Sequence, residues 1–256
     1  MELTHDELAA LDTRLGVTVY DGPSQIDGQP IIAVITLKSR NPKTGAMAQL
    51  WILRKDITPS QAIRQGKDRS ICGSCPLSGN GTAPRVCYVN LMGPEGVFSR
   101  FHKGRYPVVT ADRLARLLTG RKLRHGAYGD PAALPFDVIA NLSALVDGWT
   151  GYTHQFDTAD SRFSAYLMAS ADNDARRALA HSLGYRTFTV RPLGSVPAQG
   201  EIFCPATPEG GHRTKCITCG LCNGKTGTAD RRKDIAILAH GAAKKRFRTI
   251  ALQVVA

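Results

Sequence analysis

The sequence lacks the features that would place it in a membrane or send it out of the cell. Its longest strongly apolar run, Ile31–Leu37, is far shorter than the ~20 residues that a membrane span needs. Its first seven residues are rich in acidic side chains and do not follow the basic-then-apolar layout of a secretory signal. The chain also has no internal repeat and no low-complexity tract. We therefore expect a cytoplasmic globular protein that does not bind membranes.

Acidic residues are scarce relative to basic ones. The 256 residues contain 21 Asp and Glu against 33 Lys and Arg, which gives a net charge of +12. The excess is concentrated at the C-terminal end, because residues 213–256 hold ten Lys and Arg against two Asp. A basic segment attracts polyanions, so a nucleic acid or nucleotide is the expected partner. The most basic run surrounds Phe247, a pattern that suits phosphate contacts with base stacking, and contains Lys244, Lys245, Arg246 and Arg248.

Apolar and charged residues, at 43% and 21%, are in the range of soluble globular proteins. A chain of this length can bury a core without disulfides or metals. The seven cysteines would stay reduced in a cytoplasmic protein. We therefore interpret them as metal ligands or catalytic thiols rather than as a disulfide framework.

The pattern of apolar residues predicts an α/β protein with two units. Residues 1–110 form a β-rich unit in which the runs Thr18–Tyr20, Ile31–Leu37 and Ala48–Arg54 predict an antiparallel meander. Residues 111–256 alternate between strands and helices, which predicts a parallel sheet that is either doubly wound or curled into a full or partial barrel. The strands expected there are Leu123–Tyr128, Gly151–Gln155, Ala165–Ala169, Tyr185–Arg191, Glu201–Cys204 and Ile235–His240, with helices over Pro135–Val146 and Asp174–Leu183.

Polar residues follow the predicted parallel strands where each one ends. Because the carboxyl ends of parallel strands form one edge of a sheet, sites tend to form there. The candidate catalytic residues at this edge are Asp130, His154, Asp172 and Arg191. His154 is the expected proton carrier, since the imidazole pKa lies near neutrality, and Arg191 would hold an anionic group such as phosphate. The alternative for the aspartates is a helix-capping role.

The cysteines fall into two sets. The second set is Cys204-x11-Cys216-x2-Cys219-x2-Cys222. Its C-x2-C-x2-C run favours a [4Fe–4S] cluster, because a cubane offers one iron to each of several closely spaced thiolates, whereas structural zinc usually takes C-x2-C pairs from separate segments. Zinc and free buried thiols are the alternatives for this set.

The first set is Cys72-x2-Cys75-x11-Cys87. Three thiolates are a candidate cofactor-binding set, which would hold a second cubane with one iron open to a substrate. Alternatively, His102 completes a four-ligand cluster or zinc site. A third option is that both sets contribute to a single site.

Several segments together resemble a group of largely uncharacterised bacteriophage and prophage proteins. The resemblance is carried by Trp51–Arg54, Ile71-Cys72-x2-Cys75-Pro76, Cys87–Asn90, Gly126-x-Tyr128-Gly129-Asp130-Pro131 and Gly151–Gln155. It implies no established activity. More distantly, a cysteine-ligated cluster beside a partial TIM-type barrel is similar to the radical S-adenosylmethionine superfamily. The chain lacks the usual C-x3-C-x2-C of that superfamily, so we carry over neither S-adenosylmethionine binding nor any catalytic residue.

The sequence thus predicts an iron–sulfur enzyme that acts on a nucleotide or nucleic acid in the cytoplasm, which would be the host cytoplasm if a phage encodes the protein. The rival hypothesis is a nucleic-acid-binding protein without catalysis, in which Fe–S or zinc sites only brace the loops.

Overall fold

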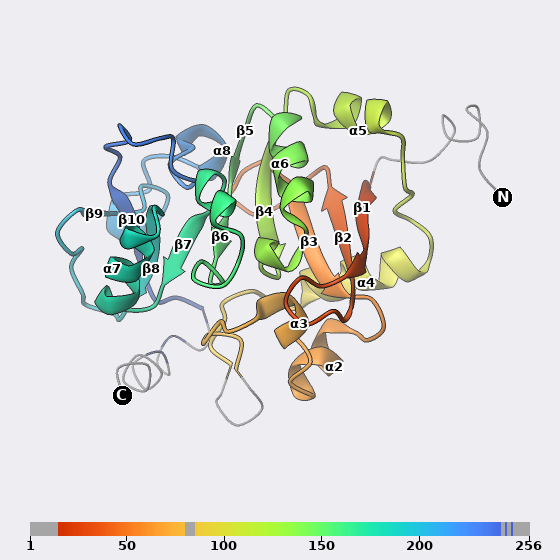
Figure 1. Cartoon of the computed structure of the whole chain (residues 1–256), viewed down its shortest axis with the longest axis horizontal. Coiled ribbons are helices and arrows are strands. Elements are labelled where there is room, and N and C mark those ends of the chain that lie inside the picture. The colour runs from red at the N-terminus through yellow and green to blue at the C-terminus, as the bar shows by residue number, and fades with distance from the viewer. Residues whose placement is uncertain (1–14, 80–84, 242–243, 245–246, 248–256) are drawn as a thin grey trace.

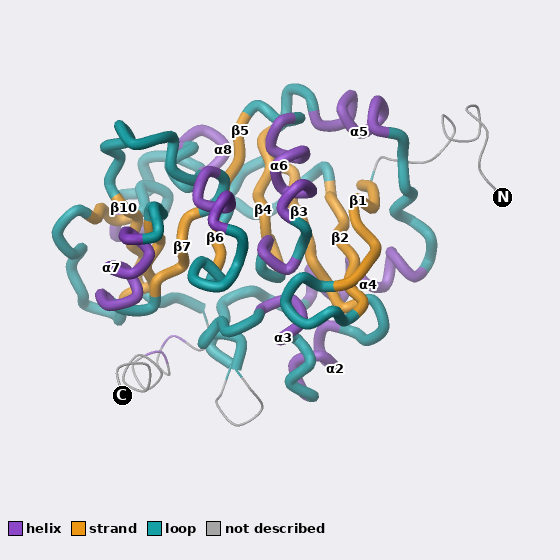
Figure 2. The backbone as a smooth tube through the Cα atoms, in the orientation of Figure 1, coloured by secondary structure: helices purple, strands orange, loops and turns teal. Residues whose placement is uncertain are grey.

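The strands form two sheets that follow one another across the molecule (Figures 1 and 2). The computed structural model describes residues 15–79, 85–241, 244 and 247. In order across the first sheet lie β1 (Gly16–Pro23), β2 (Pro30–Thr36), β3 (Ala48–Arg54), β4 (Lys122–Tyr128) and β5 (Gly148–Thr150). In order across the second sheet lie β6 (Tyr152–Thr153), β7 (Met168–Ala171), β8 (Thr187–Arg191), β10 (Asp234–Leu238) and β9 (Glu201–Phe203).

The first sheet is mixed. β1, β2 and β3 pair antiparallel, which confirms the predicted meander. β2 reads as a continuous apolar run because Ile31–Ile35 are fully buried on both faces of the sheet. β4 then pairs with β3 in parallel, so one sheet contains strands from both sides of residue 110. The division into two domains stays a prediction.

All pairs in the second sheet are parallel, which confirms in part the parallel sheet predicted for the C-terminal half. The strand predicted over Leu123–Tyr128 lies instead in the first sheet, as β4. The described strands do not close into a barrel, because β1 and β9 each stand at the edge of a sheet with one hydrogen-bonded neighbour. The fold is therefore a mixed α/β arrangement with open sheets.

One residue separates the two sheets. Gly151 lies between β5 and β6, and a Cβ there would stand 2.5 Å from Leu167 Cδ2 and 3.0 Å from His125 Cβ. The strand predicted over Gly151–Gln155 was thus too long: only β6 lies within that range, and β5 ends one residue before it. The strand predicted from Ala165 was also wrong at its start, because Asp160 caps a 3₁₀ turn, η2 (Ser161–Ala165), and β7 begins only at Met168.

Helices flank the sheets and the loops at their ends. They are α2 (Pro59–Arg64), α3 (Arg69–Cys72), α4 (Met92–His102), α5 (Ala111–Leu118), α6 (Phe136–Ala144), α7 (Asp174–Ser182) and α8 (Cys216–Cys219), with 3₁₀ turns η1 (Pro131–Ala133) and η3 (Pro208–Gly210). In Figure 1, α6 and α7 lie in front of the strands, and α2 and α3 lie beyond their lower ends. α6 and α7 confirm the two helices that the sequence predicts. The side chain of Asn173 caps α7, and Gly184 follows the helix at φ +83°.

Two apolar cores support the sheets. The larger core packs around β2, β3 and β4 and reaches α6 and the start of β7. The smaller core packs around β8 and β10 and includes Cys204 and Cys222, with Cys75 and Cys87 packed against it. Cysteines of both sets therefore border the same small core. In the described part of the chain, no helix has the length and apolar character needed to cross a bilayer.

Candidate functional site

The first cysteine set lies on a loop that is fixed to the end of β6. Cys72 is the last residue of α3, and the Cys75 amide donates to its carbonyl at 3.1 Å. The Gln155 side chain clamps this turn: its Nε2 donates to the Cys72 carbonyl at 3.2 Å, and its Oε1 accepts from the Ser74 amide at 3.3 Å. Gly73 is required there, because it has φ +55° and a Cβ would lie 2.3 Å from Gln155. The loop returns through Cys87, whose amide donates to the Leu77 carbonyl at 2.8 Å.

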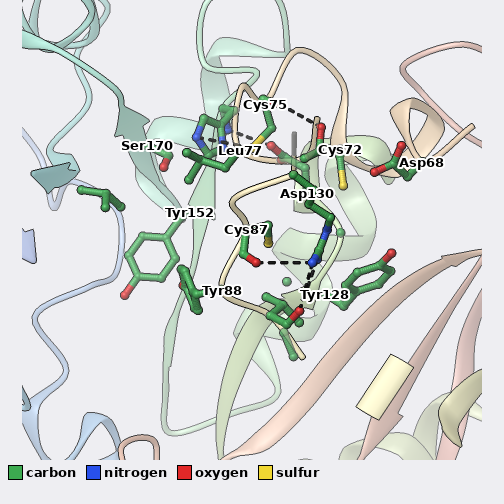
Figure 3. Close-up of a pocket in the computed structure, with 18 of the residues that line it drawn as sticks. Asp68, Cys72, Cys75, Leu77, Cys87, Tyr88, Tyr128, Asp130, Tyr152 and Ser170 are labelled. Carbon is green, nitrogen blue, oxygen red and sulfur yellow. Dashed lines mark hydrogen bonds between the residues drawn. The ribbon is translucent and has the colours of Figure 1, made fainter. Parts of the chain in front are cut away.

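All three cysteines of this set line one cavity of about 120 Å³ (Figure 3). The strands contribute the opposite wall, because β4, β6, β7 and β8 bring their carboxyl ends to it. Strand and strand-end residues that line the cavity include Tyr128, Asp130, Tyr152, His154, Ser170 and Val190. The cavity thus lies at the strand edge where the sequence analysis places a site, and we name it the cysteine cavity.

The structure brings three of the four candidate catalytic residues together. Asp130 Oδ2 accepts from the His154 amide at 2.7 Å, and its Oδ1 accepts from the Ala132 amide at 3.0 Å. The His154 ring places Nε2 at 3.3 Å from Asp172 Oδ1 and at 3.7 Å from Cys75 Sγ. A histidine at the end of β6 therefore lies between a carboxylate and a thiol of the first cysteine set.

Arg191 is not brought into the cysteine cavity. Its Nε donates to Glu201 Oε2 at 2.7 Å, and its terminal nitrogen donates to Asp174 Oδ1 at 3.0 Å. These two carboxylates occupy the guanidinium with internal partners. Its role in holding an anionic group stays a prediction.

His102 is also placed elsewhere. Its Nε2 lies 2.9 Å from the Lys55 carbonyl, and its ring stacks on Phe98 at 4.3 Å between centroids. It does not line the cysteine cavity. His154 is instead the histidine that contacts a cysteine of the first set.

Burial dominates the electrostatics of the cysteine cavity. It raises the pKa of the Cys72 and Cys87 thiols, and it raises the pKa of Asp68 to about 6. Burial also opposes protonation of His154, but the adjacent Cys75 and Asp172 outweigh it, so the pKa of that imidazole lies well above its ordinary value. A metal centre bound there would instead lower the pKa of the thiols, because a coordinated thiol is deprotonated outright.

The second cysteine set gathers at a separate place. Cys204, Cys216, Cys219 and Cys222 line a narrow cavity of about 10 Å³ between α8, the end of β9 and the start of β10. The loop after α8 reaches the junction of the two sheets, where the Gly151 amide donates to the Cys222 carbonyl at 2.9 Å. Arg186 holds the same loop by donating to the carbonyls of Leu221 and Asn223 at 2.7 and 3.3 Å.

The loop between β2 and β3 covers α8 from the other side. The amides of Cys216 and Ile217 donate to the carbonyls of Lys43 and Thr44 at 3.0 and 3.1 Å. Burial raises the pKa of Cys204 and of Cys216, and the positive charge of Lys43 opposes this for both. A cation from the first sheet is thus held beside the second cysteine set.

Tyr152 connects the two places. Its ring lines the cysteine cavity. Its hydroxyl interacts with the Cys222 thiol, which opposes the effect of burial on the pKa of that thiol. One tyrosine therefore contacts the surroundings of both cysteine sets.

Sequence reasoning did not single out Arg85 and Arg124, which also line the cysteine cavity. Arg85 donates to the Cys87 and Val89 carbonyls at 3.3 and 3.4 Å. The signal for Arg85 was its place two residues before Cys87. The signal for Arg124 was its charge within an otherwise buried strand.

No family model matches the chain, and neither the curated proteins nor the solved structures give a match. The resemblance to phage proteins and the distant similarity to the radical S-adenosylmethionine superfamily therefore stay predictions.

Among the described residues, no three or more His, Cys, Asp and Glu side chains are arranged as ligands of one metal ion. The two cysteine sets are gathered, but not in the close geometry of a single-ion site.

Proposed function

We propose that the protein is an iron–sulfur enzyme that acts on a nucleotide or nucleic acid. The observation that carries the proposal is the cysteine cavity: three thiols, His154 and Asp130 line one cavity at the carboxyl ends of parallel-paired strands from both sheets, while the other four thiols gather elsewhere. The first cysteine set therefore lies beside candidate catalytic residues, whereas the second set is enclosed by loops.

The four thiols of the second set would hold a structural [4Fe–4S] cluster. A cubane binds each thiolate at a different corner, so its ligands lie farther apart than those of one ion. The cavity between the four thiols is about 10 Å³, so the loop that carries α8 would have to move outward to admit a cubane. Lys43 supplies positive charge next to Cys204 and Cys216, which would offset the negative charge of a thiolate-ligated cluster.

The three thiols of the first set would hold a second cluster with one iron available to a small ligand. The cysteine cavity has room beside the thiols for a small group, but at about 120 Å³ it is smaller than the roughly 300–1,000 Å³ of pockets that enclose a whole ligand. The larger part of a nucleotide or strand would therefore lie outside it.

His154 would carry a proton to or from the reacting group. The carboxylate of Asp172 orients its ring through Nε2, and Asp130 fixes its backbone. The cluster would supply redox chemistry when bound, and the chain's own residues would position the substrate and move the proton.

The convergence of four cysteines on one narrow cavity also suits one alternative, because zinc accepts four cysteines. The thiols would have to draw together around the ion, since the described side chains do not form a single-ion site. With zinc there and no cluster in the first set, the protein would be a nucleic-acid-binding protein with structural metal and no redox chemistry.

The test is anaerobic purification followed by analysis of iron, acid-labile sulfide and zinc beside a visible absorption spectrum. Two double variants assign the metal, Cys72→Ser with Cys75→Ser for the first set and Cys216→Ser with Cys219→Ser for the second. We expect roughly eight iron and eight sulfide per chain in the wild type and roughly four in each double variant. Cyanide should perturb the electron paramagnetic resonance of the first-set cluster alone.

Iron and sulfide at roughly four each, lost only from the second-set variant, would remove the catalytic cluster and leave a structural one. Zinc without sulfide would overturn the iron–sulfur assignment and favour the alternative. A His154→Ala variant that keeps its iron but gains a cyanide response absent from the wild type would make His154 a ligand rather than a proton carrier.

A further inference from the structure

A second, larger hollow lies next to the second cysteine set. It has a volume of about 880 Å³, within the range of pockets that enclose a ligand. Four segments line it, namely the loop between β2 and β3, Leu193 after β8, the segment from Ala206 to α8, and the end of β10 with the residues that follow it. We call it the basic groove; its cationic lining residues are Lys43, Arg213, Lys215 and Lys244, and the imidazoles of His212 and His240 lie beside them.

The positive charge of the basic groove exceeds its negative charge. Among the described lining residues the one carboxylate is Glu209, which accepts from the Leu238 amide at 2.8 Å and lies within electrostatic reach of Lys43. It faces four Lys and Arg side chains, so the lining stays net positive. Within the described chain, the ammonium groups of Lys43 and Lys215 have no hydrogen bond or ion pair, and Arg213 donates only through Nε, to the Gly210 carbonyl at 3.0 Å. Free cations converging on a concave surface create a field that attracts anions.

The basic groove also offers flat and apolar surfaces. The His240 ring is exposed and stacks on Tyr88, with 4.6 Å between the ring centroids. Leu193, 43% exposed, also lines the groove. Rings and apolar side chains beside cations suit a ligand that carries both phosphates and bases.

We propose that the basic groove binds the phosphates of a nucleotide or of a nucleic acid strand, with Lys43, Arg213 and Lys215 as the phosphate contacts. The class of partner rests on the proposed function, but the site differs from the predicted contacts of the C-terminal run. Of that run, Lys245, Arg246 and Arg248 lie outside the described residues, whereas the three cations named here come from other parts of the chain.

The second cysteine set would hold the groove in shape. The Lys43 carbonyl accepts from the Cys216 amide, and Lys215 directly precedes Cys216. Metal bound at Cys216 would therefore fix the backbone on which two of the three phosphate contacts stand. Binding in the groove is expected to weaken when the second set is emptied.

The test compares the metal-loaded wild type with a Lys43→Gln, Arg213→Gln, Lys215→Gln triple variant. The charge-matched control is Lys103→Gln, Arg105→Gln, Arg116→Gln, at three exposed positions outside the basic groove. The probe is a fluorescein-labelled single-stranded DNA oligonucleotide followed by anisotropy over a salt series, with ATP and inorganic triphosphate as competitors. Iron and sulfide are measured in every preparation.

We expect the groove variant to bind the oligonucleotide at least tenfold more weakly and to reduce the salt slope by about 2, since each phosphate contact on a single strand contributes roughly 0.7. The control variant should keep the wild-type affinity and the wild-type salt slope. Competition by ATP would place a mononucleotide in the groove, and failure of ATP to compete would place a strand there.

The proposal would be overturned if the groove and control variants lost equal affinity for the oligonucleotide, or if the wild type bound none of the probes. These results are distinct from a failure of the proposed function, which appears as missing iron and sulfide in the wild type. The groove variant retains all seven cysteines, so its metal content should match that of the wild type.

Discussion

His125 is fully buried in β4 without a charged partner. Its Nε2 lies 2.9 Å from Ser143 Oγ, whose proton the Ile139 carbonyl accepts at 2.8 Å. The ring therefore donates through Nε2, and its Nδ1 has no hydrogen-bond partner among the described residues. Burial lowers the pKa of His125 to about 3, so the folded protein keeps this ring neutral at pH values where an unfolded chain protonates it.

This residue makes folding sensitive to acid. The unfolded state takes up a proton near pH 6.5, while the folded state does so only near pH 3. Stability from the neutral ring is complete above pH 6.5 and is lost as the pH falls toward 3, by on the order of 4 kcal/mol. Urea unfolding of a His125→Leu variant should show a flatter stability–pH curve than the wild type over this range.

An exposed histidine provides the control. A His102→Leu variant should keep the wild-type slope of stability against pH between pH 6.5 and pH 3. A His125→Gln variant serves if the leucine side chain prevents folding. Curves of equal slope for His125→Leu and the wild type would show that the ring is solvated or already paired.

At the scale of elements, the loop that carries Cys222 is held by close backbone contact. Gly224 packs on η2, and a Cβ there would lie 2.2 Å from the backbone carbon of Ala165. The neighbouring Lys225 amide donates to the Ser164 carbonyl at 2.7 Å. A side chain at Gly224 would therefore push the loop away from η2 and move Cys222.

We expect Gly224→Ala to lower the free energy of unfolding by roughly 1–3 kcal/mol and to lower the metal content of the second cysteine set. Gly227→Ala is the control, because Gly227 has φ +77° but open space around it, so the change should cost about 1 kcal/mol of backbone strain and leave metal binding intact. Urea unfolding and metal analysis of both variants test this. Equal metal content in the two would show that the loop does not position Cys222.

At the scale of the whole molecule, the second cysteine set lies where separate parts of the chain meet. The loop between β2 and β3 contacts α8, the loop after α8 contacts Gly151 between the two sheets, and Cys204 follows β9. Metal bound there would crosslink the first sheet to the second. Because α8 has only four residues, its loop has little regular structure of its own.

Removing the metal with a chelator should therefore loosen the segment from Arg213 to Lys225 before it loosens β1–β3. Limited trypsin digestion followed by mass spectrometry measures this, and cleavage after Arg213, Lys215 and Lys225 should speed up in the metal-free protein. The Cys216→Ser, Cys219→Ser variant should match the chelated wild type. Unchanged cleavage of the segment, or equally faster cleavage after Arg54, the one trypsin site within β1–β3, would show that the metal does not brace this region selectively.

Prediction from sequence succeeded where the signal is local. The meander, α6 and α7 follow from periodicity over a few residues, and Asp130 and His154 were predicted to meet because both follow parallel strands. It failed at Ala165, where the Asp160 cap redirects the chain, and it was silent on Arg124. The sequence also did not predict the ion pair of Arg191 with Glu201, because Glu201 becomes a partner only when β8 and β9 both pair with β10.

By itself, the sequence determined the α/β alternation, the three-plus-four grouping of the cysteines and the candidate residues at the strand edge. Each of these depends on spacing along the chain or on the period of apolar side chains. Only the tertiary structure decided that Gly151 divides the strands into two sheets, that His154 rather than His102 reaches the first cysteine set, and that Lys43, Arg213 and Lys215 share one groove. These features depend on contacts between segments at least 79 residues apart or on the space available to a Cβ, and no local pattern encodes either.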